Sequence, residues 1–216
     1  MPPQAVICDM DGLLLDTERL SEQSFRACCE QFNLGFDAAL FAELTGQSGP
    51  AHLRILNRYL PNIAEEFDSR WKQIYHELLA DGVPVKAGIP AFLEKMKAAH
   101  IRLAVATSSR TDKAHRYLDM AGLASYFSHI LGSDLVTHAK PAPDIYLLAV
   151  ERLAVSATSC MVLEDSNNGV AAALASQIRT IHLPDTQIPA RAFAENPQYL
   201  HADTLAMAER LIFQAE

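Results

Sequence analysis

Short apolar runs that alternate with helical patterns constrain the fold of this chain most strongly. Val6, Ile7 and Cys8 form the first run, and its continuous apolar character is typical of a strand covered on both faces. Later strand-length runs lie at residues 103–106, 129–132, 160–163 and 178–183. Helical patterns separate these runs from residue 85 onward, and such alternation predicts a parallel sheet with helices on both faces. We therefore expect an α/β chain with a three-layer, Rossmann-like core.

A long helical segment follows the first strand. Apolar residues recur at helical spacing between residues 18 and 82, and no strand pattern occurs there. We expect an all-helical cap domain over residues 16–84, inserted into a catalytic core formed by residues 1–15 and 85–216. A chain of 216 residues is long enough to bury a core of this size.

The overall charge argues against several classes of partner. The chain carries 18 basic and 26 acidic residues, a formal net charge of −8, and it contains no basic run. Nucleic acids and anionic membranes are therefore poor partners, and no apolar stretch has the length of a membrane span. The N-terminus lacks the basic region of a signal peptide, so the cytoplasm is the expected location. No pattern encodes the oligomeric state, and a monomer is the default.

The cysteines favour the same location. They are Cys8, Cys28, Cys29 and Cys160. Two lie within predicted strands, two are adjacent on a predicted helix, and none forms a C-x-x-C pair. These positions favour reduced thiols in an intracellular protein.

Polar side chains occur where the predicted strands end. They are Asp9, Asp11, Thr107, Lys140, Glu164 and Asp165. In a parallel sheet the carboxyl ends of the strands share one edge, so these side chains can converge on one crevice. Carboxylates brought together need a cation, and an all-oxygen donor set suits Mg²⁺. A hydroxyl and a lysine beside them suit a phosphate group, and a spare carboxylate can act as nucleophile. The set predicts phosphoryl transfer through an aspartyl-phosphate.

Each of these groups also has a plain structural interpretation. The run from Asp9 to Gly12 is typical of a solvated turn, and Thr107-Ser108-Ser109 of a helix N-cap. A lone lysine is usually solvated, and two acids can simply end a strand. Their shared position at strand ends favours the joint, functional interpretation.

Four segments, in order along the chain, resemble the motifs of the haloacid dehalogenase-like hydrolases. The first is DMDGLLLDTE from Asp9 to Glu18, and the second is ATSS from Ala106 to Ser109. The third is KPAPD at residues 140–144, and the fourth is LEDSNNG at residues 163–169. The similarity covers nearly the whole chain, and its nearest branches are the β-phosphoglucomutase-like phosphatases and the pseudouridine 5′-monophosphatases. The helical segment is similar to the small mobile cap of this family.

The resemblance implies a role in the chemistry for each matching acid. Asp9 would be the nucleophile and a Mg²⁺ ligand. Asp11 would act as general acid and then as general base, with its backbone carbonyl on the metal. Asp165 would be the second carboxylate on Mg²⁺, with Glu164 a direct or water-mediated ligand.

The resemblance also implies a phosphate-binding set. Thr107 and the N–H groups near Ser108 and Gly12 would hold the phosphoryl oxygens. Lys140 would neutralise charge on Asp9 and on the transferring group.

Two departures from the mutases favour a phosphatase. Ser21 stands where they carry a proton-shuttling His, and Gly49 lies near the place of their phosphate-binding Arg. Water is then the expected final acceptor, and a sugar phosphate or nucleoside monophosphate the expected substrate. A sugar-phosphate mutase of the β-phosphoglucomutase type is the alternative, and a non-catalytic binding protein on the same fold is the second. Candidate substrate contacts in the cap are Arg19, Gln47, Ser48 and Arg54.

Overall fold

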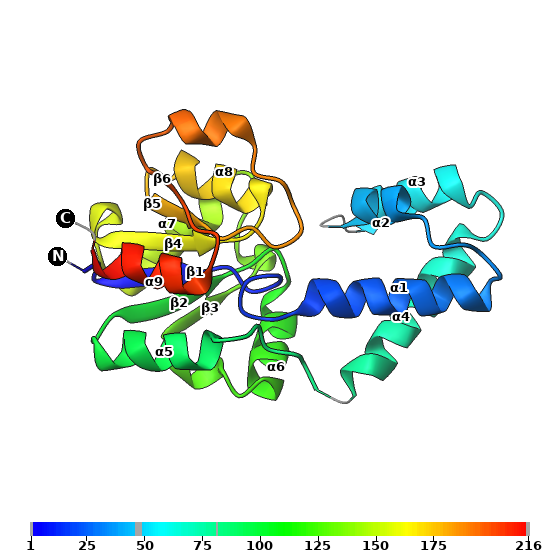
Figure 1. Ribbon diagram of the computed structural model, residues 1–216, viewed down its shortest axis with the longest axis horizontal. Helices are drawn as coiled ribbons and strands as arrows, with labels where there is room; N and C mark the ends of the chain where they lie inside the picture. The colour runs from blue at the N-terminus through cyan, green and yellow to red at the C-terminus, as the bar shows by residue number, and fades with distance from the viewer. Residues whose placement is uncertain (1, 46–48, 81, 215–216) are drawn as a thin grey trace. The chain divides into compact units, whose positions relative to one another are not determined.

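The predicted strands form one parallel sheet in the computed structural model (Figure 1). The structure describes residues 2–45, 49–80 and 82–214. The order of the six strands is β3-β2-β1-β4-β5-β6, and every neighbouring pair is parallel. Their bounds are β1 Ala5–Cys8, β2 Arg102–Ala106, β3 His129–Leu131, β4 Cys160–Glu164, β5 Arg179–His182 and β6 Tyr199–His201. The expected α/β class is confirmed.

Helices cover both faces of the sheet (Figure 1). On one face, Tyr146, Ala149 and Ala172 pack in a buried cluster with Ile7 of β1. On the other face, α5 and α9 lie together. The helix bounds are α5 Ile89–Ala98, α6 Thr111–Met120, α7 Asp144–Leu153, α8 Asn167–Ala175 and α9 Leu205–Phe213. Short 3-10 helices are η1 Ala124–Tyr126, η2 Ser133–Leu135, η3 Ala157–Ser159 and η4 Arg191–Glu195.

The strand order fixes where a ligand can bind. From β1 the sheet extends through β2 to β3 on one side, and the chain then returns to β4 on the other side. This reversal is the switch point of a doubly wound sheet, and it opens a crevice beyond the carboxyl ends of β1 and β4. Asp9 and Asp165 are the residues that directly follow these two strands.

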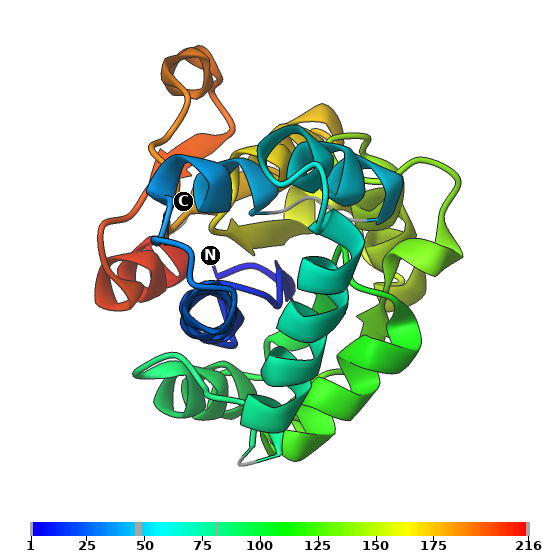
Figure 2. The ribbon, with the colours of Figure 1, turned by 90° about the vertical axis from the view of Figure 1, so that its right-hand side faces the viewer.

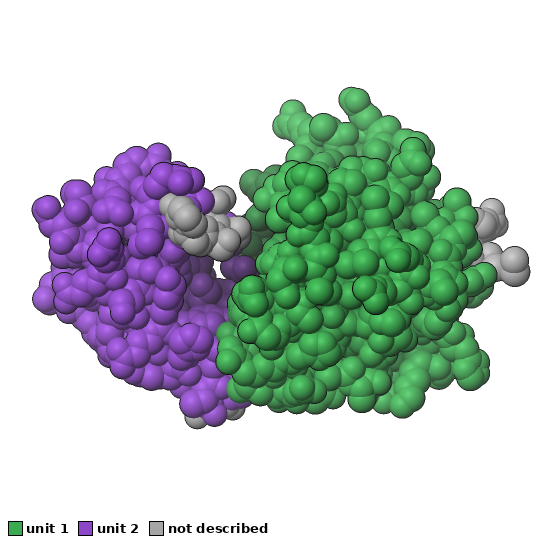
Figure 3. All heavy atoms as spheres, turned by 180° about the vertical axis from the view of Figure 1, so that it is seen from behind, with its two compact units in different colours: residues 1–16, 85–216 green, residues 17–84 purple. Residues whose placement is uncertain are grey.

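The chain divides into two compact units, Met1–Asp16 with Val85–Glu216, and Thr17–Pro84 (Figure 3). The described helices of the second unit are α1 Thr17–Gln31, α2 Ala38–Leu44, α3 Gly49–Tyr59 and α4 Ala64–Leu79, and Figure 2 shows α1 nearly along its axis. Phe25 of α1 packs edge-on against Phe67 and Trp71 of α4, and these rings form the centre of the helical core. None of the described helices is both long and apolar enough to cross a bilayer.

The two chain segments that lead into and out of the helical unit are joined to each other. Leu15 and Val85 form an isolated antiparallel bridge, and the Lys86 amide donates to the Leu14 carbonyl at 3.0 Å. The bridge and the hydrogen bond both join residues of the sheet-containing unit. The helical unit therefore begins and ends beside one point of the core.

One strand forms in a proline-containing segment that shows no strand pattern in the sequence. Residues 184–202 contain three prolines, yet β6 forms near the end of this segment and pairs with β5, with Leu200 opposite Ile181. Three residues are too few to show a period-two pattern. The strand forms because the edge of β5 offers unpaired backbone groups.

The burial of the cysteines leads to a prediction about their reactivity. All four thiols are free and buried, and burial raises the pKa of Cys8 and of Cys28 to about 12 and that of Cys160 to about 11. Because the thiolate is the reactive form, none is expected to react with a disulfide reagent in the folded protein at mildly alkaline pH. All four are expected to react in guanidinium chloride. A thiol that reacts rapidly before unfolding would contradict this prediction.

Candidate active site

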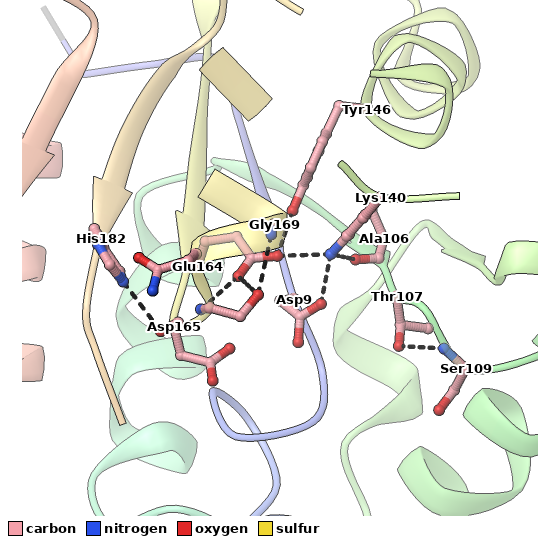
Figure 4. A network of polar contacts seen from close by, with 12 residues as sticks. Asp9, Ala106, Thr107, Ser109, Lys140, Tyr146, Glu164, Asp165, Gly169 and His182 are labelled. Atoms are coloured by element: carbon pink, nitrogen blue, oxygen red, sulfur yellow. Dashed lines mark hydrogen bonds and ion pairs between the residues drawn. The ribbon is translucent and has the colours of Figure 1, made fainter. Parts of the chain in front are cut away.

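Side chains from separate segments meet at the switch point (Figure 4). Asp9 follows β1 and Thr107 follows β2. Glu164 ends β4, and Asp165 comes directly after it. Lys140 arrives from the loop between η2 and α7. The structure thus gathers at one sheet edge the side chains that the sequence places at strand ends.

Lys140 is the centre of the hydrogen-bond network. Its ammonium donates to Asp9 Oδ1 at 2.6 Å, to Glu164 Oε1 at 2.6 Å and to the Ala106 carbonyl at 2.9 Å. These contacts use all three of its protons, and the side chain is only 3% exposed. Burial alone would lower the pKa of Lys140, but the Asp9 and Glu164 carboxylates outweigh it and hold this pKa well above its ordinary value. Lys140 is therefore a permanent, fixed positive charge beside Asp9.

Glu164 accepts a hydrogen bond from Lys140 and is itself held by other donors. Its Oε1 also accepts from the Tyr146 hydroxyl at 2.8 Å, and its Oε2 accepts from the Ser166 amide at 2.9 Å and hydroxyl at 3.1 Å. Burial would raise the pKa of Glu164, but Lys140 and the other donors lower it below its ordinary value. A Cβ on Gly169 would lie 1.6 Å from Oε1, so the start of α8 must present a glycine here.

The acids expected to hold the metal differ in their hydrogen bonds. Four donors contact the two oxygens of Glu164. The Asp11 carboxylate accepts from the Ser109 hydroxyl at 2.8 Å, whereas its backbone carbonyl is the group expected on the metal. Across residues 2–45, 49–80 and 82–214, no three His, Cys, Asp or Glu side chains form a ready-made metal cluster. Asp9, Asp11, Glu164 and Asp165 stay the predicted ligands.

Asp9 and Asp165 are buried carboxylates whose negative charge is poorly balanced by nearby positive charges and hydrogen-bond donors. Burial raises the pKa of Asp9 to about 8 despite Lys140, and Glu164 adds to this rise. Burial, with the charges of Glu164 and Asp9, raises the pKa of Asp165 well above its ordinary value. Asp165 Oδ1 is buried without a hydrogen-bond partner. An unpartnered buried oxygen, beside two further acids that share one ammonium, fits a hard divalent cation such as Mg²⁺, which commonly takes only one or two protein carboxylates.

Gly12 allows Asp165 to approach the first motif. The φ of Gly12 is +86°, and a Cβ there would lie 2.3 Å from Asp165 Oδ2. Its amide, expected to face phosphate, already donates to the Leu15 carbonyl at 2.9 Å. The structure therefore shows that Gly12 permits the close approach of Asp165, and that its amide is bonded within its own loop; phosphate binding near Gly12 stays a prediction.

The second motif forms a small turn beside Asp9. Thr107 Oγ1 accepts from the Ser109 amide at 3.0 Å, and Thr107 is 1% exposed. A hydroxyl that accepts this bond keeps its own proton to donate. Ser108 lies exposed between the two. The turn can thus offer a hydroxyl proton to an anion.

Sequence reasoning assigned no role to Tyr146, Ser109 or His182. Tyr146 has the spacing of the apolar face of α7, and His182 lies within a predicted strand, so both resemble core residues. The sequence holds a positional signal for Tyr146, which follows Lys140 by six residues, whereas the pairing of His182 with Glu164 across the sheet is visible in the structure alone.

The candidate substrate contacts lie in the helical unit. Arg19 is on α1. Arg54 is on α3 and lines a cavity of about 390 Å³. Its other lining residues are Glu43, Ala51, Ile55 and Arg58. Gln47 and Ser48 lie outside the described residues. These residues stay candidates for substrate contact.

A doubly wound sheet with acids and a buried lysine at its switch point is typical of enzymes that act on anionic substrates. The family model of the haloacid dehalogenase-like hydrolases matches residues 6–183. The chain belongs to the haloacid dehalogenase-like hydrolase family. The family expected from the four motifs is therefore confirmed.

Similar proteins of named activity indicate which class of enzyme this family member belongs to. A phosphorylated carbohydrates phosphatase from Thermotoga maritima is 34% identical over 185 residues, 83% of this chain and 84% of that protein. A fructose-1-phosphate phosphatase from Escherichia coli is 32% identical over 178 residues, 79% of this chain and 91% of that protein. The crystal structure of a candidate β-phosphoglucomutase from Thermotoga maritima has a TM-score of 0.79 and 30% identity, covering 97% of this chain and 96% of that one. They support the expected enzyme class, a phosphoric monoester hydrolase.

Proposed function

We propose that this protein is a Mg²⁺-dependent phosphatase that hydrolyses a small phosphomonoester, a sugar phosphate or nucleoside monophosphate, through an aspartyl-phosphate on Asp9. The observation that carries the proposal is the buried Asp9 carboxylate at the switch point, held at one oxygen by Lys140. Relatives named as sugar-phosphate phosphatases support the substrate class.

Asp9 acts as the nucleophile and Asp11 transfers protons. A carboxylate oxygen of Asp9 attacks phosphorus, and the bond from phosphorus to the leaving oxygen breaks. Asp11 donates a proton to that oxygen and afterwards accepts one from the water that hydrolyses the aspartyl-phosphate. The hydrogen bond from Ser109 holds Asp11 within reach of the second motif.

The remaining groups stabilise negative charge. Lys140 balances the charge of Asp9 and of the transferring phosphoryl group, and Thr107 and the turn at Ser108 donate to its oxygens. The Asp9 and Asp165 carboxylates and the Asp11 carbonyl would hold Mg²⁺. When bound, Mg²⁺ neutralises phosphoryl oxygens and screens the two carboxylates from each other.

Phosphate release from p-nitrophenyl phosphate tests the proposal. We expect release in the presence of Mg²⁺, its loss on chelation and its return when Mg²⁺ is restored. A panel of phosphomonoesters scored by kcat/KM, including hexose phosphates and pseudouridine 5′-phosphate, would then identify the substrate. No release under any of these conditions would favour the non-catalytic binding protein.

A sugar-phosphate mutase is the second candidate, favoured by the likeness to the candidate β-phosphoglucomutase. Ser21, on α1, stands against it because a hydroxyl is a poorer proton shuttle than imidazole at neutral pH. Incubation with β-glucose 1-phosphate and a bisphosphate primer separates the two. Formation of glucose 6-phosphate would reject the phosphatase assignment.

Magnesium binding is expected to strengthen with rising pH. The pKa of Asp9 is about 8 without metal, so at neutral pH most of this carboxyl must lose a proton before it can bind a cation. Loss of the Asp9 proton alone is expected to lower the dissociation constant by up to about tenfold per pH unit below about pH 8, and the raised pKa of Asp165 adds to this pH dependence. Calorimetry in two buffers of different ionisation enthalpy measures the affinity and the proton release. Binding without proton release at neutral pH would contradict this expectation.

A further inference from the structure

A line of hydrogen bonds leads from the candidate active site across the sheet to its far edge. Glu164, His182 and His201 are register partners on β4, β5 and β6, so they lie side by side across three strands. Tyr199 begins β6, and its ring lies 5.9 Å from that of His182. The described mechanism uses none of the residues on β5 and β6.

His182 contacts the active-site backbone directly (Figure 4). It is fully buried, and its Nε2 lies 3.0 Å from the carbonyl oxygen of Asp165. A carbonyl only accepts, so Nε2 carries the proton. A neutral imidazole that has its proton on Nε2 has none on Nδ1. Its Nδ1 is then an acceptor, and the donor to it is the Tyr199 hydroxyl at 3.2 Å.

The peptide group that His182 contacts is held at both ends. The Asp165 carbonyl and the Ser166 N–H belong to one planar peptide, and the Ser166 N–H donates to Glu164 Oε2 at 2.9 Å. His182 fixes the oxygen end and Glu164 the nitrogen end. This peptide therefore links His182 to the carboxylate that orients Lys140.

Asp165 depends on this peptide for its direction. Its Oδ1 has no hydrogen-bond partner, so the buried side chain is not held at that atom. The direction of the side chain therefore depends on its close packing against Gly12 and on the backbone that carries it. A rotation of the peptide would move both the Asp165 carboxylate and the anchor of Glu164.

We propose that His182 and Tyr199 are positioning residues of the active site, which fix the Asp165–Ser166 peptide and through it the carboxylates of Asp165 and Glu164. The effect on catalysis rests on the proposed function, whereas the effect on the peptide does not. The outer end of the line is polar as well, because Tyr199 Oη lies 3.4 Å from His201 Nδ1 and His201 Nε2 lies 2.9 Å from Asp203 Oδ1. Burial raises the pKa of Tyr199, which keeps its hydroxyl protonated and able to donate.

The first test observes the imidazole itself. Long-range ¹H–¹⁵N correlation spectra distinguish the two neutral tautomers of histidine, and His182→Gln identifies the signal. We expect the neutral Nε2–H form at neutral pH, and in Tyr199→Phe a shift of the Nδ1 resonance because its donor is lost. A proton on Nδ1, or a spectrum unaffected by Tyr199→Phe, would overturn the proposal without reference to activity.

The second test compares matched substitutions. His182→Gln keeps an N–H near the position of Nε2, whereas His182→Met has similar volume and no donor. Tyr199→Phe removes only the hydroxyl, and Tyr126→Phe removes a hydroxyl bonded to Glu94 elsewhere in the same unit. The readouts are the calorimetric Mg²⁺ dissociation constant, kcat and KM for p-nitrophenyl phosphate, and the Tm.

Loss of one positioning bond is expected to weaken Mg²⁺ binding and to lower kcat by about 2-fold to 10-fold in Tyr199→Phe and in His182→Met, with little change in KM. His182→Gln is expected to recover most of the loss, and Tyr126→Phe to match the native protein. A lower Tm with unchanged Mg²⁺ affinity and kcat in the folded variants would mean a purely structural role and overturn the proposal. If the native protein releases no phosphate, the proposed function fails, but the tautomer and the Mg²⁺ affinities still decide this inference.

Discussion

Asp9→Asn is expected to abolish phosphate release, lowering kcat for p-nitrophenyl phosphate by on the order of 10⁴-fold or more, because an amide oxygen cannot replace the nucleophilic carboxylate. The Asn side chain can still accept the hydrogen bond from Lys140. The local geometry is therefore expected to persist, and activity can be lost without unfolding.

The same substitution is expected to leave Tm unchanged or to raise it. The folded protein raises the pKa of Asp9 from 3.8 to about 8, so its ionised form is disfavoured by folding. A carboxyl with a raised pKa contributes stability below its unfolded pKa and loses it as pH rises through the folded pKa. The advantage of Asp9→Asn in Mg²⁺-free buffer should therefore widen between about pH 4 and pH 8.

A surface substitution provides the control for Asp9→Asn. Asp119→Asn changes an exposed carboxylate on α6 and is expected to alter neither kcat nor Tm. Residual activity of Asp9→Asn within tenfold of the native protein would exclude Asp9 as the nucleophile. A large loss of Tm at neutral pH would instead show that its charge stabilises the fold.

Lys140→Met is expected to remove activity and stability together. The buried acids Asp9 and Glu164 would lose their shared ammonium, and breaking such a buried pair costs about 3–5 kcal/mol. Without this fixed charge beside the phosphoryl group, kcat is expected to fall by on the order of 10²-fold to 10³-fold. Thermal unfolding and steady-state kinetics measure the two effects.

A double variant separates these two consequences of losing Lys140. Adding Glu164→Gln removes one uncompensated charge, so Lys140→Met/Glu164→Gln should recover part of the lost stability and none of the lost activity. Lys97→Met, on the exposed side of α5, is the matched control and should resemble the native protein. If Lys140→Met unfolds at the native Tm, the ion pairs do not stabilise the fold, and the network described above needs another explanation.

The sequence predicts the sheet and the edge where its polar residues meet. Buried strands such as β1 and β4 are visible as apolar runs, and the acids after them are visible because charge directly after such a run is unusual. Asp9, Thr107 and Lys140 could therefore be selected from residue type and position. The roles assigned to them stay predictions.

The sequence does not predict the direction of each side chain. Glu164 and Asp165 are adjacent in sequence, but successive residues of an extended chain point to opposite sides: the Glu164 oxygens accept hydrogen bonds, whereas Asp165 Oδ1 has no hydrogen-bond partner. Tyr146 has the spacing of an apolar helix face, and nothing in that spacing shows that its hydroxyl meets Glu164. The amide of Gly12 is used by Leu15, a local bond that no periodic pattern encodes.

The bridge between Leu15 and Val85 has a consequence for engineering. The chain leaves the sheet-containing unit for the inserted helices, and returns from them, next to this bridge. The two ends of the insert therefore lie close together. We expect such an insert to tolerate exchange for the corresponding segment of a relative while the strand order of the sheet is kept.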